Sequence, residues 1–240
     1  MPGVTALFMD DGGVMSDNTL RSPEWHRLVA EFFAPRPGGD SAAWSEANRV
    51  VFERLVPLLI SGPREQDYVT WFDLYQLQWL REMVAYVGVI APIDDVQCLG
   101  LVWQASDYIT QRVHSAYPGV VDAIRTLHRK GFKLFTASGE HSRELNGYLK
   151  GMGIREYFDT LYGSDLVNLG KYSIEYYRRI FDHAGVAPNH ALVVDDKLHN
   201  LAWAASLGAI TCLVSASPHG GAEADFIIPS LADLPAALEK

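Results

Sequence analysis

The pattern of hydrophobic and polar positions changes character twice along the chain. Residues 4–8 form an apolar run that predicts a buried strand. About a hundred residues then follow in which apolar positions recur at spacings of three and four, as in amphipathic helices, with no convincing strand. The clearest such series is Tyr68, Trp71, Phe72, Tyr75, Trp79, Met83 and Tyr86. From residue 120 onward, apolar strand-like runs and helical patterns alternate.

The middle part predicts a set of helices only. We expect them at residues 23–33, 41–60, 65–87 and 94–115. Pro35 and Pro37 stop the first helix, and Pro57 either kinks or ends the second.

The last part predicts helices at residues 120–130, 142–150, 173–184 and 199–207, with a short helix closing the chain. The intervening strands are expected at residues 132–136, 160–162, 191–195, 209–214 and 226–228. Alternation of this kind requires a parallel sheet with right-handed crossovers. We therefore predict an α/β fold in which a Rossmann-like parallel sheet forms the core from residues 1–16 and 118–240. An all-helical domain, residues 17–117, is inserted after the first strand.

Candidate chemistry begins where the first predicted strand ends. Asp10 and Asp11 follow the apolar run directly, and Gly12 and Gly13 come next. Glycine lets the backbone fold tightly around a ligand. In parallel α/β sheets, ligands bind at the carboxyl ends of the strands.

Three later positions carry polar residues suited to the same site. Thr136 with Ala137 offers a hydroxyl and backbone N–H groups before a helix, where anions bind. Lys171 can neutralise a negative intermediate, and Asp195 and Asp196 end another strand. Asn200 follows one helical turn after this second acid pair. Each of these residues alone has a plainer explanation as a loop residue, a helix cap or a surface charge. The occurrence of all four polar segments in this order, each at a predicted strand end, favours a single site.

Two carboxylates brought together by neighbouring strands predict a Mg²⁺ site, because this hard cation takes oxygen ligands. The expected ligands are Asp10, Asp196 and the backbone carbonyl of Gly12.

These motifs resemble those of the haloacid dehalogenase superfamily. Asp10 with Gly13-Val14-Met15 is similar to its first motif, Thr136 to its second, Lys171 to its third and Asp195-Asp196 to its fourth. The helical insertion matches the cap that this family places between the first two motifs. The resemblance implies that Asp10 is a nucleophile forming a covalent aspartyl intermediate. It further implies that Thr136 and Lys171 stabilise anionic groups, and that Asp196, with or without Asp195, holds Mg²⁺.

Gly12 departs from the phosphatases that this chain resembles. They carry a second Asp at this position, which protonates the leaving alcohol, and glycine has no side chain that can do so. A backbone carbonyl can still bind a metal, so only the proton transfer is lost.

Two branches of the family tolerate a residue other than an acid at this position. The phosphonatase branch needs a cap lysine for a Schiff base, and this chain has no lysine before Lys130. The dehalogenase branch attacks carbon but commonly has Ser and Asn where this chain has Asp195, Asp196 and Lys197. This difference leaves room for a relative that opens a carbon–nitrogen bond, as the azetidine-carboxylate hydrolase of the family does. Asp195 or Asp196 then serves as the base for the water that hydrolyses the ester.

The insertion is expected to select the substrate. It holds five of the six tryptophans, most of which we assign to packing within its own helices. Arg21 and Trp25, just after the first motif, are the candidates for holding a small substrate with a carboxylate and an apolar part. We also place Gly12, Gly13, Ala137 and Asn200 among the substrate-binding residues. Glu140 and His141 either face the site or cap a helix.

Composition narrows the class of partner. The formal charge of −9 argues against nucleic acid and anionic membranes, and the substrate is expected to be a small molecule. Two distant cysteines and the absence of a basic leader favour a cytoplasmic protein with reduced thiols. A homodimer is one possibility that the sequence leaves open.

The sequence thus favours a hydrolase that cleaves a carbon–heteroatom bond of a small molecule through an Asp10 ester. The alternatives are a Mg²⁺-dependent phosphatase with an unusual first motif and a binding or regulatory protein that has lost catalysis.

Overall fold

The computed structural model describes residues 3–63, 67–90, 94–217 and 223–239. The chain divides into two compact units: Met1–Asn18 with Ser115–Lys240, and Thr19–His114. These bounds lie within three residues of the predicted division at residues 16/17 and 117/118. Within the described residues, no helix is long and apolar enough to cross a membrane.

The first unit is built on a six-stranded parallel sheet with the order β3-β2-β1-β4-β5-β6. Its strands are β1 (Ala6–Met9), β2 (Lys133–Ala137), β3 (Thr160–Tyr162), β4 (Ala191–Asp195), β5 (Ile210–Val214) and β6 (Phe226–Ile228). β1 lies in the middle of the sheet, between β2 and β4. The α/β fold with a parallel sheet is confirmed, and its carboxyl edge brings the ends of β1, β2 and β4 together.

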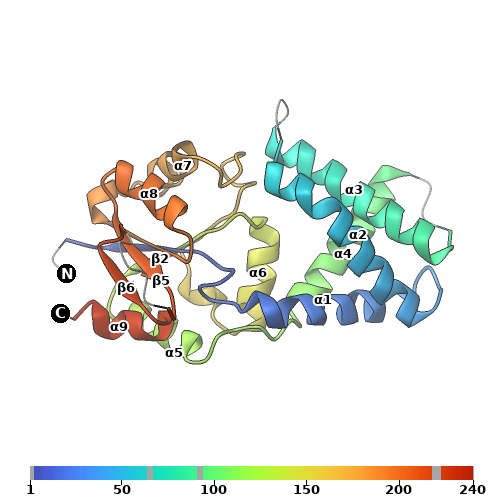
Figure 1. Ribbon diagram of the computed structural model, residues 1–240, viewed down its shortest axis with the longest axis horizontal. Helices are drawn as coiled ribbons and strands as arrows, with labels where there is room; N and C mark the ends of the chain where they lie inside the picture. The colour runs from blue at the N-terminus through green and yellow to red at the C-terminus, as the bar shows by residue number, and fades with distance from the viewer. Residues whose placement is uncertain (1–2, 64–66, 91–93, 218–222, 240) are drawn as a thin grey trace. The chain divides into compact units, whose positions relative to one another are not determined.

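Helices cover both faces of this sheet (Figure 1). One face carries α5 (Val120–Arg129), α6 (Ser142–Gly151) and α9 (Leu234–Ala237), whose leucine, isoleucine and valine side chains pack on Leu7 and Met9. The other face carries α7 (Ile174–Ala184) and α8 (Leu198–Ser206), which pack on Phe8. Short 3-10 helices lie at Arg155–Tyr157, Pro188–His190 and Leu231–Asp233. Because β1 is buried on both faces, its sequence is continuously apolar.

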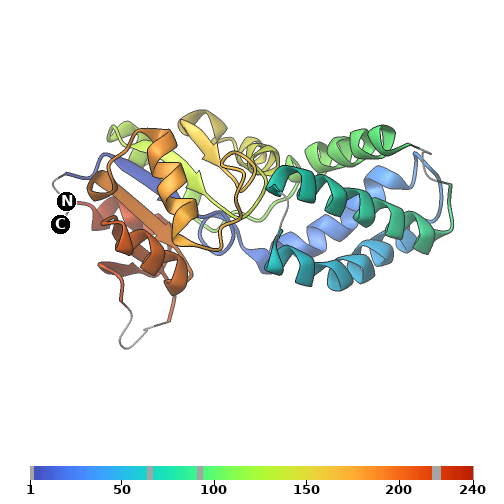
Figure 2. The same cartoon turned by 90° about the horizontal axis from the view of Figure 1, so that it is seen from above.

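The second unit consists of helices (Figure 2). They are α1 (Asn18–Phe33), which begins in the first unit, α2 (Ser41–Ser61), α3 (Tyr68–Val87) and α4 (Asp95–Thr110). Asp40, Asp67 and Asp94 each cap a helix by accepting a hydrogen bond from a backbone N–H three residues later.

Aromatic side chains form much of the interior of this second unit. Trp44 is fully buried and stacks on Phe33, with ring centroids 4.9 Å apart. Trp79 is also buried and donates a hydrogen bond from its indole N–H to Asn48 Oδ1 at 3.0 Å. Trp44 and Trp79 therefore pack the unit itself, as expected for most of the tryptophans.

Two predicted helix ends differ from the structure. α1 begins at Asn18, five residues before the expected start at Pro23. Proline lacks an N–H, so it removes one helical hydrogen bond, but the helix continues through it. α4 ends at Thr110, five residues before the expected end, because the N–H groups of Arg112 and Val113 both turn back to the carbonyl of Ile109.

Candidate active site

The ends of β1 and β4 bring two of the predicted acids side by side. Met9 pairs with Val194 in the parallel register, and the N–H of Asp10 donates to the Val194 carbonyl at 2.9 Å. Asp10 and Asp195 are therefore neighbours at the carboxyl edge of the sheet, although 185 positions separate them in sequence.

Lys171 joins these two carboxylates. Its Nζ lies 2.6 Å from Asp195 Oδ2 and 3.1 Å from Asp10 Oδ1. It also donates to the Ala137 carbonyl at the end of β2, at 2.7 Å. The lysine side chain is 5% exposed, so this ion-pair network is almost fully shielded from water. The predicted convergence of Asp10, Lys171 and Asp195 is present in the structure.

Burial dominates the protonation of this site. Desolvation of the carboxylate, with a further contribution from the charges of Asp195 and Asp11, raises the pKa of Asp10 to about 7 against the opposing effect of Lys171. Burial disfavours the charge of Lys171, but the negative charge of Asp10 and Asp195 outweighs it and raises the lysine pKa well above its usual value. These effects favour the charged form of Lys171 and bring the pKa of Asp10 close to neutrality.

Asp195 is held by donors on all sides. Nδ2 of Asn200 lies 3.1 and 3.0 Å from its two carboxylate oxygens, and the N–H of Lys197 donates to Oδ1 at 2.8 Å. Both oxygens of Asp195 are therefore occupied by protein donors. The sequence placed Asn200 among the substrate-binding residues, whereas the structure places its Nδ2 on Asp195.

Asp196 has a different environment. Its Oδ2 lies 2.7 Å from Nζ of the exposed Lys197. Its Oδ1 is buried, and within the described part of the chain it has no hydrogen-bond partner. Carboxylate oxygens of Asp10, Asp195 and Asp196 lie within 4.8 Å of one another. A buried carboxylate oxygen in an acidic cluster is suited to a metal ion or to a polarised water.

The loop after β1 is a tight turn closed by Asp11 and Ser16. The carbonyl of Asp11 accepts from the N–H groups of Val14, Met15 and Ser16, and the Ser16 hydroxyl donates to Asp11 Oδ1 at 3.1 Å. Gly13 has a φ of +82°, and a Cβ there would lie 2.5 Å from Asp196 Oδ2. Glycine is therefore required at position 13 both by conformation and by the close approach of Asp196.

Thr136 differs from its predicted role. It lies within β2 opposite Met9, is fully buried, and donates its hydroxyl to the Tyr162 carbonyl on β3 at 3.3 Å. β2 runs one residue further than expected because Ala137 pairs with Tyr162. The first hydroxyl beyond the strand is that of Ser138.

Ser138 and Tyr176 are site residues that the sequence did not single out. Ser138 is buried, and the N–H of Glu140 donates to its Oγ. The hydroxyl of Tyr176 donates to the carbonyls of Ser138 and Tyr162, at 3.0 and 3.1 Å, and so ties α7 to the ends of β2 and β3. The available sequence signal was the short spacing from Lys171 to the paired tyrosines, which places them on the first turn of the following helix.

Glu140 and His141 belong to the turn that leads into α6. His141 is the N-cap residue and accepts the Arg143 N–H, while the Ser142 N–H and hydroxyl both donate to Asp165. Of the two interpretations left open by the sequence, His141 thus has the helix-capping contact. Arg21 and Trp25 lie on α1 in the second unit, where Arg21 is buried and Trp25 half-buried, and their role toward Asp10 stays a prediction.

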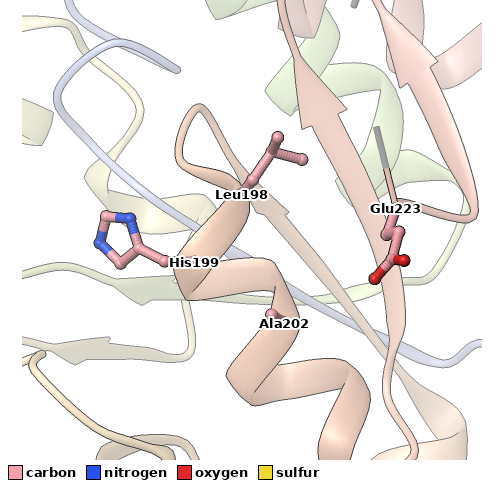
Figure 3. A pocket seen from close by; sticks show the side chains of 4 residues that line it. All are labelled: Leu198, His199, Ala202 and Glu223. Carbon is pink, nitrogen blue, oxygen red and sulfur yellow. The ribbon is translucent and has the colours of Figure 1, made fainter. Parts of the chain in front are cut away.

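A separate shallow pocket of about 330 Å³ lies beside α8. Leu198, His199 and Ala202 line it from the helix, and Glu223 lines it from the segment before β6 (Figure 3). None of these four lining residues is among the predicted catalytic residues.

The family model for haloacid dehalogenase-like hydrolases matches residues 5–208, which include the ends of β1, β2 and β4 and the lysine between them. The chain belongs to this family. The resemblance to the haloacid dehalogenase superfamily is confirmed, and the α/β core matches the fold of solved structures named as haloacid dehalogenases.

Relatives of this haloacid dehalogenase-like hydrolase differ in their reported activities. The pyrophosphatase PpaX of Halalkalibacterium halodurans is 26% identical over 123 residues, which cover 49% of this chain and 57% of that protein. The chain thus spans little more than half the length of this curated relative. A defluorinating L-2-haloacid dehalogenase superimposes with a TM-score of 0.68 at 21% identity, covering 99% of this chain and 96% of that one. A phosphatase from Thermococcus onnurineus gives a TM-score of 0.59 at 18% identity, covering 98% of both chains. Since both chemistries occur on this fold, the residues of the site must distinguish them.

Proposed function

We propose that this hydrolase cleaves a carbon–heteroatom bond of a small carboxylate through a covalent ester on Asp10. The observation that carries the proposal is Gly12, which leaves no acidic side chain two residues after the nucleophile. A departing alkoxide needs a proton from such an acid, whereas a halide or an already protonated ring amine does not. The lack of this acid therefore supports attack on carbon over attack on phosphorus.

In the first step, one oxygen of Asp10 attacks a tetrahedral carbon that carries the leaving group. A carbon–oxygen bond forms, the carbon–heteroatom bond breaks, and the leaving group takes the electron pair. A halide departs into solvent, while a ring amine remains attached to the opened product. Lys171 contacts Oδ1 of Asp10, so it orients the carboxylate with Oδ2 toward the substrate.

In the second step, water attacks the carbonyl carbon of the Asp10 ester. Lys171 neutralises the tetrahedral oxyanion, and the ester collapses to give a hydroxy product and a carboxylate with one oxygen from water. Asp195 is an unsuitable base because both its oxygens accept hydrogen bonds from protein donors. The buried Oδ1 of Asp196 has no such bond among the described residues, so we assign the base to Asp196.

The second candidate is a Mg²⁺-dependent phosphatase, which the acidic cluster favours. Asp10, Asp196 and the carbonyl of Gly12 would hold the ion, and the unpartnered Oδ1 of Asp196 fits an oxygen ligand of this kind. Bound Mg²⁺ would supply positive charge to a phosphoryl group. The curated relatives include phosphatases, which is consistent with this alternative.

We assign substrate selection to the helical unit as a cap. Arg21 is proposed to pair with the carboxylate and Trp25 to contact the apolar part of a small substrate. A small soluble substrate is consistent with the net charge of −9 and with a cytoplasmic location.

A single-turnover reaction in ¹⁸O-labelled water tests the proposal. Enzyme in excess is mixed with 2-chloropropionate or azetidine-2-carboxylate, and the peptide containing Asp10 is analysed by mass spectrometry. One ¹⁸O in Asp10, with halide release or ring opening, is expected. Turnover of p-nitrophenyl phosphate that requires Mg²⁺, with no reaction of either carbon substrate, would establish the phosphatase instead.

A further inference from the structure

The side chain of Asn18 lies in tight contact with the position that a side chain at residue 12 would take, and it would have to shift by a few tenths of an ångström to admit a Cβ there. A Cβ built on Gly12 would lie 3.0 Å from Nδ2, 3.1 Å from Oδ1 and 3.5 Å from Cγ of Asn18. Asn18 is the last residue of the core unit, so this contact lies within one compact body. The amide group of Asn18 therefore covers Gly12 where the chain turns away from the nucleophile.

Gly12 is a glycine for a different reason from Gly13. The backbone of Gly13 has a φ of +82°, which disfavours any side chain. Gly12 is not among the positive-φ residues, so its backbone accommodates an ordinary side chain. The three heavy atoms nearest to a Cβ at position 12 all belong to the amide group of Asn18.

We infer that Asn18 is a specificity-determining residue that closes position 12 to a general acid and supplies a neutral amide in its place. This inference rests on the proposed function. An amide N–H donates a hydrogen bond to a departing halide or to a substrate carboxylate, but it transfers no proton at neutral pH. The pair Gly12–Asn18 thus selects leaving groups that depart without enzyme protonation.

Four variants test this inference: G12D, N18A, G12D/N18A and the control G12D/N189A. Asn189 is an exposed asparagine in the 3-10 helix Pro188–His190, which precedes β4, whereas Asp195 lies at the opposite end of that strand. Phosphate release with Mg²⁺ is measured on p-nitrophenyl phosphate and on 2-glycerophosphate. Only the second substrate has a poor leaving group that depends on an acid.

The double variant G12D/N18A is expected to raise kcat/KM for 2-glycerophosphate about 100-fold over the wild type, the lower end of the effect of a general acid. G12D and G12D/N189A are expected to fall well short of this gain, because Asn18 still lies against position 12. An equal gain in G12D would overturn the inference, and so would the absence of a gain in G12D/N18A.

The single variant N18A leaves Gly12 unchanged and alters an exposed residue, so it should fold normally. It therefore tests the inference even if the variants that carry G12D fail to fold. Its kcat for halide release should fall about tenfold, the effect of one lost hydrogen bond. If the wild type releases halide and N18A does so with the same kcat, the inference is contradicted and the proposed function is not. If the wild type attacks no carbon substrate but 2-glycerophosphate hydrolysis is still faster in G12D/N18A than in G12D, the proposed function is contradicted and the inference is not.

Discussion

The ammonium group of Lys171 lies 2.6 Å from Oδ2 of Asp195 and 3.1 Å from Oδ1 of Asp10, so its shorter contact is with Asp195. Asp195 is fully buried and also accepts from Asn200 and from the Lys197 backbone. This arrangement makes Asp195 the anchor of Lys171. Asp195 thereby holds the positive charge of Lys171 next to the nucleophile Asp10. The lysine side chain then does not have to move during the reaction.

Replacing Lys171 with methionine should abolish turnover and destabilise the fold. The substitution leaves the buried carboxylates of Asp10 and Asp195 without their cation, which costs about 3–5 kcal/mol. The penalty is expected at pH 8 and should shrink toward pH 4, where Asp10, whose pKa is raised to about 7, takes up a proton. Urea unfolding of K171M and wild type at both pH values measures it. Equal losses at the two pH values would show that packing, rather than unpaired charge, is responsible.

Replacing Asp10 with asparagine should remove activity yet stabilise the metal-free protein. The folded state raises the pKa of Asp10 from 3.8 to about 7, so the folded protein binds its proton more tightly than the unfolded chain. Stability from this group is complete below pH 3.8 and is lost as pH rises through 7. Asparagine stays neutral, so D10N should gain about 1–3 kcal/mol at pH 8 and little at pH 4. Thermal unfolding in EDTA at both pH values checks this, and a less stable D10N at pH 8 would contradict it.

Alanine at positions 12 and 13 should have unequal effects on stability. G13A combines a φ of +82° with a Cβ 2.5 Å from Asp196 Oδ2, and it should cost about 2–3 kcal/mol. G12A places its Cβ 3.0 Å from Asn18 Nδ2, a contact that a shift of the amide by a few tenths of an ångström relieves for a methyl group, and it should cost less than about 1 kcal/mol. The difference between the two unfolding free energies is the measurement. Equal costs would mean that Asn18 is held as rigidly as Asp196.

The residues at the strand ends were predictable because apolar runs that stop at an acid mark the edge of a buried sheet. Asp10 and Asp195 follow this rule. The end of β2 could not be placed correctly, because the pairing of Ala137 with Tyr162 lengthens the strand by one residue and leaves Ser138 as the first hydroxyl outside it. Strand ends depend on such partners, which a single sequence does not specify.

Contacts that depend on the orientation of a side chain also could not be predicted from the sequence. Asn200 was expected near the site, but only packing directs its amide to both oxygens of Asp195. The cover of Gly12 by Asn18 likewise arises from the turn that Asp11 and Ser16 close. Neither contact leaves a periodic pattern in the sequence.

Replacing Asp196 with asparagine should separate its two candidate roles, base and metal ligand. If Asp196 is the base for ester hydrolysis, D196N should form the Asp10 ester at a near-normal rate and release the hydroxy product at least 100-fold more slowly. The covalent adduct, heavier than the protein by the substrate fragment, should then accumulate and be visible by intact-mass spectrometry without added metal. The control is N200A, which weakens the support of Asp195 but leaves Asp196 in place, and should slow both steps to a similar degree. If D196N instead forms no adduct and loses a Mg²⁺-induced rise in unfolding temperature that the wild type shows, Asp196 acts as a metal ligand rather than as the base.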